Sequence, residues 1–167
     1  MIRLFEFGPA FGLPSASPFC AKLETYLRMA NIPFEPLYRI DPRRSPKGKF
    51  PFIKDGDAHF SDSVLIIDYL EKKYQVTLDN HLTPAAKAYQ TALRCMIEDH
   101  LYWAMVFVRW FEEKNWRLIK KTFFGSVNPV VGEVAAFITR RKFKHYLHAQ
   151  GMGRHSPAEI TQLGLMD

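Results

Sequence analysis

The pattern of hydrophobic and polar positions divides the chain into two parts. Strand-like and helix-like stretches alternate over residues 1–76, whereas residues 83–167 carry helical spacing only. Apolar residues at every second position are typical of a half-buried strand, and apolar residues three and four apart are typical of an amphipathic helix. The sequence therefore predicts an α/β domain over residues 1–76 and a separate all-α domain over residues 83–167.

Turn and cap residues set the order of the elements in the first part. Ser17 followed by Pro18 favours a helix start, because serine caps helices and proline fits the first helical position. Asp55 and Gly56 join two short strand-like runs and predict a hairpin, while Pro36 favours an edge position for its strand. The expected elements are strands at 2–7, 34–40, 50–54 and 57–60, and helices that begin after Ser17 and after Ser61 or Asp62. Their order, β-α-β followed by β-β-α, is that of the thioredoxin fold.

The second part carries helix-start signals of the same kind. Thr83 and Asn128 each precede a proline, and Ser156 with Glu159 forms a capping box. An apolar stripe predicts one long amphipathic helix through Leu93, Ile97, Leu101, Met105 and Val108. The helix that follows Ser156 has apolar residues with no later segment to meet, namely Ile160, Leu163, Leu165 and Met166. We therefore expect an incomplete helical domain, either part of a longer chain or covered by a second copy in a homodimer.

The composition supports a packed core and excludes several classes of protein. The chain is 47% hydrophobic and 14% aromatic, so global disorder is excluded. No apolar run reaches the roughly 18–20 residues that a membrane span needs, and residues 1–7 are too few and too charged for a signal peptide. Two cysteines, Cys20 and Cys95, are too few for a disulfide framework, which fits a reducing compartment. We therefore expect a cytoplasmic protein.

The charge of the chain raises the question of a nucleic-acid partner. The net charge is +6, and much of the basic excess lies in residues 140–145. A nucleic-acid groove needs aromatic and arginine side chains interleaved on a sheet or a recognition helix, and the sequence has neither pattern. We interpret the basic stretch as a solvated helix face and expect no nucleic-acid partner.

Four segments, taken in order, resemble the glutathione S-transferases. The resemblance is closest to a divergent branch of that superfamily, which includes the metaxins, the failed axon connections proteins and bacterial relatives. The segments are residues 17–29, 45–53, 61–63 and 66–70. The resemblance covers the first domain well and the helical domain loosely. It implies a thioredoxin-like glutathione-binding domain followed by an incomplete version of the family's helical domain.

The resemblance also implies a glutathione site, with glutathione as a co-substrate. Phe50-Pro51 matches the family's cis-proline, whose preceding residue pairs through its backbone with the cysteinyl unit of glutathione. Asp62-Ser63 matches the acidic residue and serine that hold the γ-glutamyl carboxylate at a helix start. Lys49, with Lys47 as a second candidate, is expected to neutralise the glycyl carboxylate.

Two kinds of side chain compete for the thiol chemistry. The glutathione thiolate is the nucleophile, and a free thiol with a pKa of about 8.5 is only a few per cent ionised at neutral pH. Ser17 stands where the family places its activating serine or cysteine, and Ser15 is a second candidate for that hydroxyl. Residues 17–20 also resemble the C-x-x-C frame of glutaredoxins with the first cysteine replaced by serine. Cys20 is then either a buried structural residue or a catalytic thiol.

Three functions follow from the resemblance. The leading one is conjugation of the glutathione thiol to a small hydrophobic electrophile. The alternatives are a non-catalytic glutathione-binding or protein-interaction module, as in the metaxin-like relatives, and a glutathione-dependent thiol oxidoreductase acting through Cys20. Tyr102, Trp103, Val106 and Trp110 are either a wall for the electrophile or ordinary packing. No His or Cys cluster has metal-ligand spacing, so no metal is expected.

Overall fold

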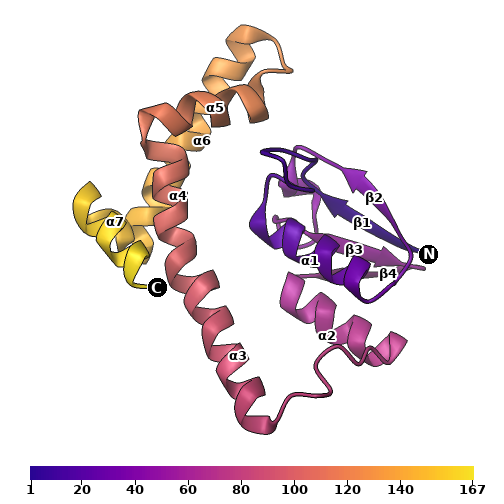
Figure 1. Ribbon diagram of the computed structural model, residues 1–167. Coiled ribbons are helices and arrows are strands. Elements are labelled where there is room, and N and C mark those ends of the chain that lie inside the picture. Colours follow the sequence, from indigo (N-terminus) through magenta and orange to yellow (C-terminus); the bar gives the residue numbers. More distant parts are fainter. The chain divides into compact units, whose positions relative to one another are not determined.

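The computed structural model describes residues 1–167 and divides them into two compact units (Figure 1). The first unit is Met1–His81 and the second is Leu82–Asp167. All strands lie in the first unit, and the second unit is built of helices. A mixed α/β unit followed by an all-helical unit is the order that the hydrophobic pattern predicts.

The first unit is a four-stranded sheet with two helices. Its elements are β1 (Ile2–Glu6), α1 (Pro18–Met29), β2 (Phe34–Tyr38), the 3-10 turn η1 (Pro42–Arg44), β3 (Phe52–Asp55), β4 (Ala58–Ser61) and α2 (Ser63–Tyr74). The strand order is β2-β1-β3-β4, with β1 and β2 parallel and the other pairs antiparallel. This is the predicted thioredoxin-like order, and it places Pro36 on an edge strand, as expected.

The hairpin between β3 and β4 differs from the prediction by one residue. Asp55 still belongs to β3 and pairs with Ala58, so the turn consists of Gly56 and Asp57. Gly56 has a φ of +59°, which glycine adopts without a steric cost. The glycine alone therefore provides the backbone conformation that the turn needs.

The two helices of the first unit bury their apolar faces in a single core. The buried cluster consists of Ile2, Leu4, Leu23, Leu27, Ile32, Ile53, Ile66 and Leu70. Leu23 and Leu27 of α1 are four residues apart, as are Ile66 and Leu70 of α2, so each pair lies on one helix face. Each such side chain contributes about 1.5–3 kcal/mol when it is fully buried.

The second unit contains one long helical rod and several shorter helices. Its elements are α3 (Pro84–Met96), η2 (Ile97–Leu101), α4 (Tyr102–Phe111), α5 (Glu113–Phe124), α6 (Pro129–Gln150), η3 (Met152–Arg154) and α7 (Pro157–Met166). Helix α3 runs through the π-helical turn η2 into α4, so the predicted long helix is present with a local widening (Figure 1). Glu112, with a ψ of 123°, separates α4 from α5. The sequence pattern misses this break because no glycine or proline marks it.

Side-chain hydrogen bonds cap the helix N-termini that the sequence predicts in this unit. Thr83 accepts a hydrogen bond from the backbone N–H of Ala86, and Asn128 accepts one from Val130. Ser156 and Glu159 form both hydrogen bonds of a capping box at the start of α7. A cap of this kind contributes about 1 kcal/mol to helix stability.

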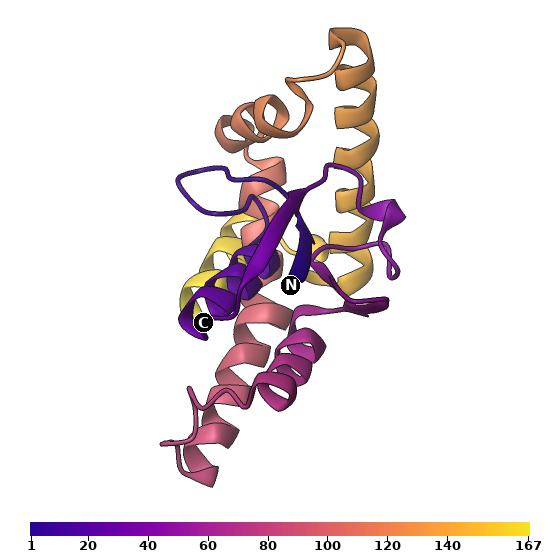
Figure 2. The ribbon, with the colours of Figure 1, turned by 90° about the vertical axis from the view of Figure 1, so that its right-hand side faces the viewer.

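Aromatic side chains fill the core of the second unit. Its buried cluster consists of Ala104, Val106, Trp110, Trp116, Ile119, Ala136, Leu147, Met152 and Ile160. Trp110 stacks on Phe143 with ring centroids 4.1 Å apart, and Figure 2 shows α6 running beside α4. Val106 and Trp110 are therefore packing residues, which is the second of the two interpretations that their sequence positions allow.

Helix α7 partly contradicts the expectation that its apolar residues lack a partner. Ile160 is buried and Leu163 packs against the same core, whereas Leu165 and Met166 are exposed. The contacts of Ile160 and Leu163 show that the helical unit encloses part of α7 by itself.

No helix of either unit combines the length and the apolar character that a bilayer span requires.

Candidate functional site

Three segments that carry predicted site residues meet at one end of the sheet in the first unit. Phe52 pairs with Ser61, so Pro51 and Asp62, the next residues outward, lie at the same end of the β3–β4 hairpin. Cys20, in the first turn of α1, packs with Phe52 in a buried cluster. The starts of α1 and α2 and the loop before β3 therefore come together. Two helix N-termini at one place favour a ligand that carries negative charge.

The peptide bond between Phe50 and Pro51 is cis, as the resemblance implies. Phe50 is buried in the same cluster as Cys20 and meets Phe7 edge to face, with ring centroids 5.1 Å apart. Pro51 is also buried. Packing of the Phe50 ring therefore holds the loop before β3 against the first turn of α1.

Asp62 and Ser63 form the start of α2. The Asp62 carboxylate accepts a hydrogen bond from the Val64 backbone N–H at 2.9 Å, which makes Asp62 the N-cap. Its φ of +82° lies in a region that residues with a side chain rarely adopt, at a cost of about 1–3 kcal/mol. Ser63 is the first helical residue and is only 5% exposed. Strained backbone of this kind concentrates at ligand sites, so the start of α2 is a candidate anion site.

Ser17 precedes α1 but does not cap it with its side chain. Pro18 takes the first helical position, as predicted, and the Ser17 hydroxyl makes no capping hydrogen bond. Ser15 is only 1% exposed, and its hydroxyl donates to the carbonyl oxygen of Phe7 at 2.7 Å. Because this proton is already donated and the Ser15 Oγ also accepts from the Ser17 backbone N–H, Ser15 has no proton left to donate to a thiolate. Ser17, which is half-buried, is therefore the better placed of the two candidate hydroxyls.

Cys20 lies one helical turn from Ser17 and is fully enclosed. Its exposed fraction is 0%, and burial raises the pKa of its thiol to about 11. Hydrogen bonding with the Phe7 backbone and the Ser17 side chain acts in the opposite direction but is outweighed. At neutral pH the side chain is a protonated thiol among aromatic rings. That environment fits a structural cysteine and not the thiolate that an oxidoreductase needs.

Lys47 and Lys49 lie in the loop that leads into β3. Both side chains are exposed, and Gly48 between them has a φ of +66°. The loop thus presents two long cationic side chains to solvent just before Phe50. This placement is compatible with a role in binding a carboxylate at the same end of the sheet.

A pair of buried carboxyl groups in the first unit is not anticipated from the sequence. Glu6 and Glu24 are 0% and 1% exposed, and Arg28 donates to Glu24 from its Nε at 2.9 Å. When Glu6 is ionised, its two oxygens have no hydrogen-bond donor. When Glu6 is protonated, its carboxyl group can donate a hydrogen bond to Glu24. Burial, with a further contribution from the charge of Glu24, raises the pKa of Glu6 to about 8. The alternation of β1 could have revealed this site, because position 6 shares a strand face with Ile2 and Leu4.

Comparison with known proteins identifies the family. The model of the glutathione S-transferase N-terminal domain matches residues 18–115. The isoprene-epoxide–glutathione S-transferase of Rhodococcus sp. (strain AD45) is 32% identical over 97% of this chain and 71% of its own length. The chain belongs to the glutathione S-transferase family.

Further relatives fall in the divergent branch that the sequence resembles. Failed axon connections of Drosophila melanogaster is 31% identical over 100% of this chain and 42% of its own length. A metaxin-2 homolog of Caenorhabditis elegans is 32% identical over 74% of this chain and 54% of its own length. The chain thus spans about half the length of these two relatives.

A solved structure supports the fold independently. Glutathione transferase F7 from Populus trichocarpa superposes with a TM-score of 0.51 and 15% sequence identity, over 89% of this chain and 72% of that chain. At this identity the likeness concerns the fold alone. It confirms a thioredoxin-like unit followed by a helical unit.

Proposed function

We propose that the chain binds glutathione at the end of the sheet in the first unit and transfers its thiol to a small electrophile. The observation that carries the proposal is the contrast between two neighbouring side chains. The Ser17 hydroxyl stands at a helix N-terminus without capping it, while the only nearby thiol, that of Cys20, is held protonated by burial. At a site of this kind the protein provides the hydroxyl donor and the ligand provides the reacting sulfur. Membership of the family supports glutathione as that ligand.

Each charged group of glutathione has a matching group at this end of the sheet. The γ-glutamyl carboxylate suits the N–H groups at the start of α2 and the Ser63 hydroxyl, and the ammonium group suits the Asp62 carboxylate. The cysteinyl amide suits the backbone of Phe50, and the glycyl carboxylate suits Lys49. In this arrangement the thiol is directed to the start of α1, where Ser17 lies.

Ser17 activates the thiol by donating a hydrogen bond to the thiolate sulfur, with help from the dipole of α1. A decrease of two pKa units requires about 2.7 kcal/mol of preferential stabilisation of the thiolate. The sulfur then attacks a carbon of the electrophile. We propose an epoxide, the class in the name of the Rhodococcus relative. A C–S bond forms, a C–O bond of the ring breaks, and the proton released by the thiol ends on the alkoxide oxygen.

A non-catalytic binding module is the second candidate. The similarity to Failed axon connections and to a metaxin homolog, whose names state no reaction, favours it. In that case the same end of the sheet binds glutathione or a protein segment and no thioether is formed. The enclosed thiol of Cys20 argues against an oxidoreductase that acts through this residue.

Calorimetric titration with glutathione tests the binding step. Ser63→Ala should weaken binding by about 1–3 kcal/mol, because the bound carboxylate loses a hydroxyl donor. Ser126→Ala, which removes an exposed hydroxyl from the second unit, should leave the affinity unchanged. Absence of binding at millimolar glutathione would contradict the proposal. Binding without thioether formation from a small epoxide would leave the module as the better description.

A further inference from the structure

The loop between β1 and α1 is held by hydrogen bonds at two places along its path (indigo in Figure 1). At its tip, the backbone N–H of Leu13 donates to the carbonyl oxygen of Ala10 at 2.9 Å, and the N–H of Ala10 donates back at 3.2 Å. At its base, the N–H of Ala16 donates to the carbonyl oxygen of Gly8 at 3.0 Å. Loops move more than the elements they connect unless such bonds hold them. The base of this loop is therefore fixed where the chain enters α1.

Ser15 connects the two ends of the loop through its side chain. Its hydroxyl donates to the carbonyl oxygen of Phe7 at 2.7 Å, and its Oγ accepts from the backbone N–H of Ser17 at 3.3 Å. The residue is only 1% exposed, and hydrogen bonds in an enclosed position are stronger than exposed ones. One buried hydroxyl thus links the residue that follows β1 to the residue that precedes α1.

Ser17 depends on this link because its own hydroxyl does not cap the helix that it precedes. Its backbone is extended, with a φ of −103° and a ψ of 130°. The direction of a side chain follows from the backbone that carries it. The bond from the Ser17 N–H to Ser15 fixes the peptide plane in front of Ser17. It therefore sets the direction in which the Ser17 hydroxyl leaves the chain.

We propose that Ser15 is a positioning residue for thiol activation, which holds Ser17 so that its hydroxyl reaches the sulfur of bound glutathione. This inference rests on the proposed function, in which Ser17 donates to that sulfur. Ser15 acts only through Ser17, because it is enclosed and its proton is donated to Phe7. A displacement of about 1 Å is enough to impair a group that must meet a reacting atom. Loss of the Ser15 hydroxyl therefore weakens the bond from Ser17 to the thiolate.

The pH dependence of thioether formation from glutathione and a small epoxide tests this role. A rise of one unit from a thiol pKa of about 6.5 in Ser15→Ala should lower the rate about ninefold at pH 5.5 and about threefold at pH 7, with recovery by pH 9. A variant that was merely less well folded would lose activity at pH 9 as well. Ser15→Cys keeps a weaker donor and acceptor of similar size, so its profile should lie between those of the wild type and Ser15→Ala.

A double variant and a matched control locate the effect. Ser15→Ala added to Ser17→Ala should lower the rate no further, because the two residues act as one unit. Ser45→Ala removes another buried hydroxyl of the first unit, one without a hydrogen-bond partner, and should keep the pH profile of the wild type. Glutathione affinity at pH 5.5, where the bound thiol is largely protonated, should be the same in Ser15→Ala, Ser45→Ala and the wild type.

Proton exchange of the Ser17 amide with water, measured by NMR on the chain without glutathione, tests the link itself. Exchange should be at least about fivefold faster in Ser15→Ala, because the amide loses its acceptor, and unchanged in Ser45→Ala. Equal exchange in Ser15→Ala and the wild type would overturn the proposal.

The kinetic results separate this proposal from the proposed function. Faster exchange with the pH profile of the wild type, or a further loss of rate in the double variant, would overturn the positioning role alone. Absence of thioether formation by the wild type would overturn the proposed function and the positioning role together.

Discussion

Ser17 and Cys20 are three residues apart at the start of α1, yet their environments are opposite. Ser17 is half-buried with a hydroxyl that caps no helix, and Cys20 is enclosed among aromatic rings. Forming a thiolate inside such a cluster is costly, and burial accordingly raises the pKa of Cys20 to about 11. This contrast supports the proposal that the reacting sulfur comes from a ligand and that the protein contributes a hydroxyl.

Replacing each of these two residues separates their roles. Ser17→Ala should raise the apparent pKa of bound glutathione and lower the rate of conjugation at pH 7 by about three- to 25-fold, because a rise of one or two units from a pKa of about 6.5 reduces the thiolate fraction by these factors. The pH dependence of the rate and the ultraviolet absorbance of the thiolate measure both effects. Cys20→Ala should leave them unchanged. If Cys20→Ala abolished turnover while Ser17→Ala did not, the chemistry would belong to Cys20.

Glu6 makes the stability of the chain depend on pH. Its folded-state pKa of about 8 is raised above the ordinary carboxyl value by burial and by the charge of Glu24. The folded state therefore holds a proton that the unfolded chain has lost over the range from about pH 4.5 to pH 8. The free energy of unfolding falls as pH rises through this window, by at most about 1.4 kcal/mol for each pH unit.

The variant Glu6→Gln should remove this slope and exceed the wild type in stability at pH 8. The amide keeps the shape of the carboxyl group, carries no charge at high pH and can donate to Glu24. Urea unfolding followed by circular dichroism at a series of pH values between 5 and 8 measures the effect. Glu35→Gln, on an exposed position of β2, is the matched control and should keep the slope of the wild type. An unchanged slope in Glu6→Gln would assign the proton to another group.

At the scale of elements, the starts of α2 and α7 show two kinds of helix cap. Ser156 and Glu159 form a relaxed capping box at α7, with Ser156 in an extended conformation. Asp62 caps α2 from a φ of +82°, which is strained for any residue with a side chain. A cap that serves stability alone has no need of this strain. We therefore infer that the conformation of Asp62 serves to direct the start of α2 toward a ligand.

Substitution of Asp62 should separate stability from binding. Asp62→Gly relieves the strain and loses only a few tenths of a kcal/mol as a cap, so we expect it to stabilise the chain by about 1 kcal/mol. Asp62→Ala keeps the strain and loses the bond to Val64, so it should destabilise the chain by about 1 kcal/mol. Both variants should bind glutathione more weakly. Urea unfolding and calorimetry on the same samples measure the two quantities, and equal stability of the two variants would argue against the strain.

At the scale of the whole molecule, the helical unit exposes an apolar stripe on α3 and η2. Tyr89, Leu93 and Ile97 follow one another four residues apart and are all exposed. This spacing places the three side chains on one helix face. Contiguous apolar surface of this kind marks protein–protein contact sites more often than free surface. We therefore expect the chain to form a homodimer through this stripe.

Light scattering tests the dimer. The wild type should have the mass of two chains, and Leu93→Glu should shift it toward one chain, because a charge at the centre of the stripe would be buried without a partner. Leu118→Glu places the same charge on an exposed apolar position of α5 and should leave the mass unchanged. A wild type with the mass of one chain would contradict the prediction.

The sequence by itself determined the features that depend on neighbouring residues. The cap at Thr83 and the capping box at Ser156 follow from hydrogen bonds within one turn, and Pro36 restricts its strand to an edge because it has no N–H to donate. The candidate residues at Phe50-Pro51 and Asp62-Ser63 came from family resemblance, and their roles remain predictions.

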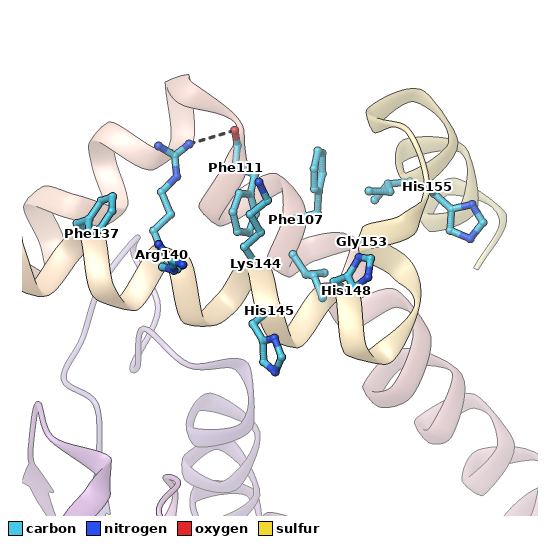
Figure 3. A pocket seen from close by; sticks show the side chains of 12 residues that line it. Phe107, Phe111, Phe137, Arg140, Lys144, His145, His148, Gly153 and His155 are labelled. Atoms are coloured by element: carbon cyan, nitrogen blue, oxygen red, sulfur yellow. Dashed lines mark hydrogen bonds between the residues drawn. The ribbon is translucent and has the colours of Figure 1, made fainter.

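Only the tertiary structure decided which side chains are enclosed and what they contact. The sequence left Cys20 open as either inert or reactive, left Val106 and Trp110 open as wall or packing, and showed Glu6 only as one polar position in a strand. The tertiary structure shows that Cys20, Val106, Trp110 and Glu6 are all buried. The pKa and the accessibility of a side chain depend on residues distant in sequence that fold around it. The pocket lined by Phe107, Leu147 and Ile160 has the same origin, since α4, α6 and α7 each contribute one of these side chains (Figure 3).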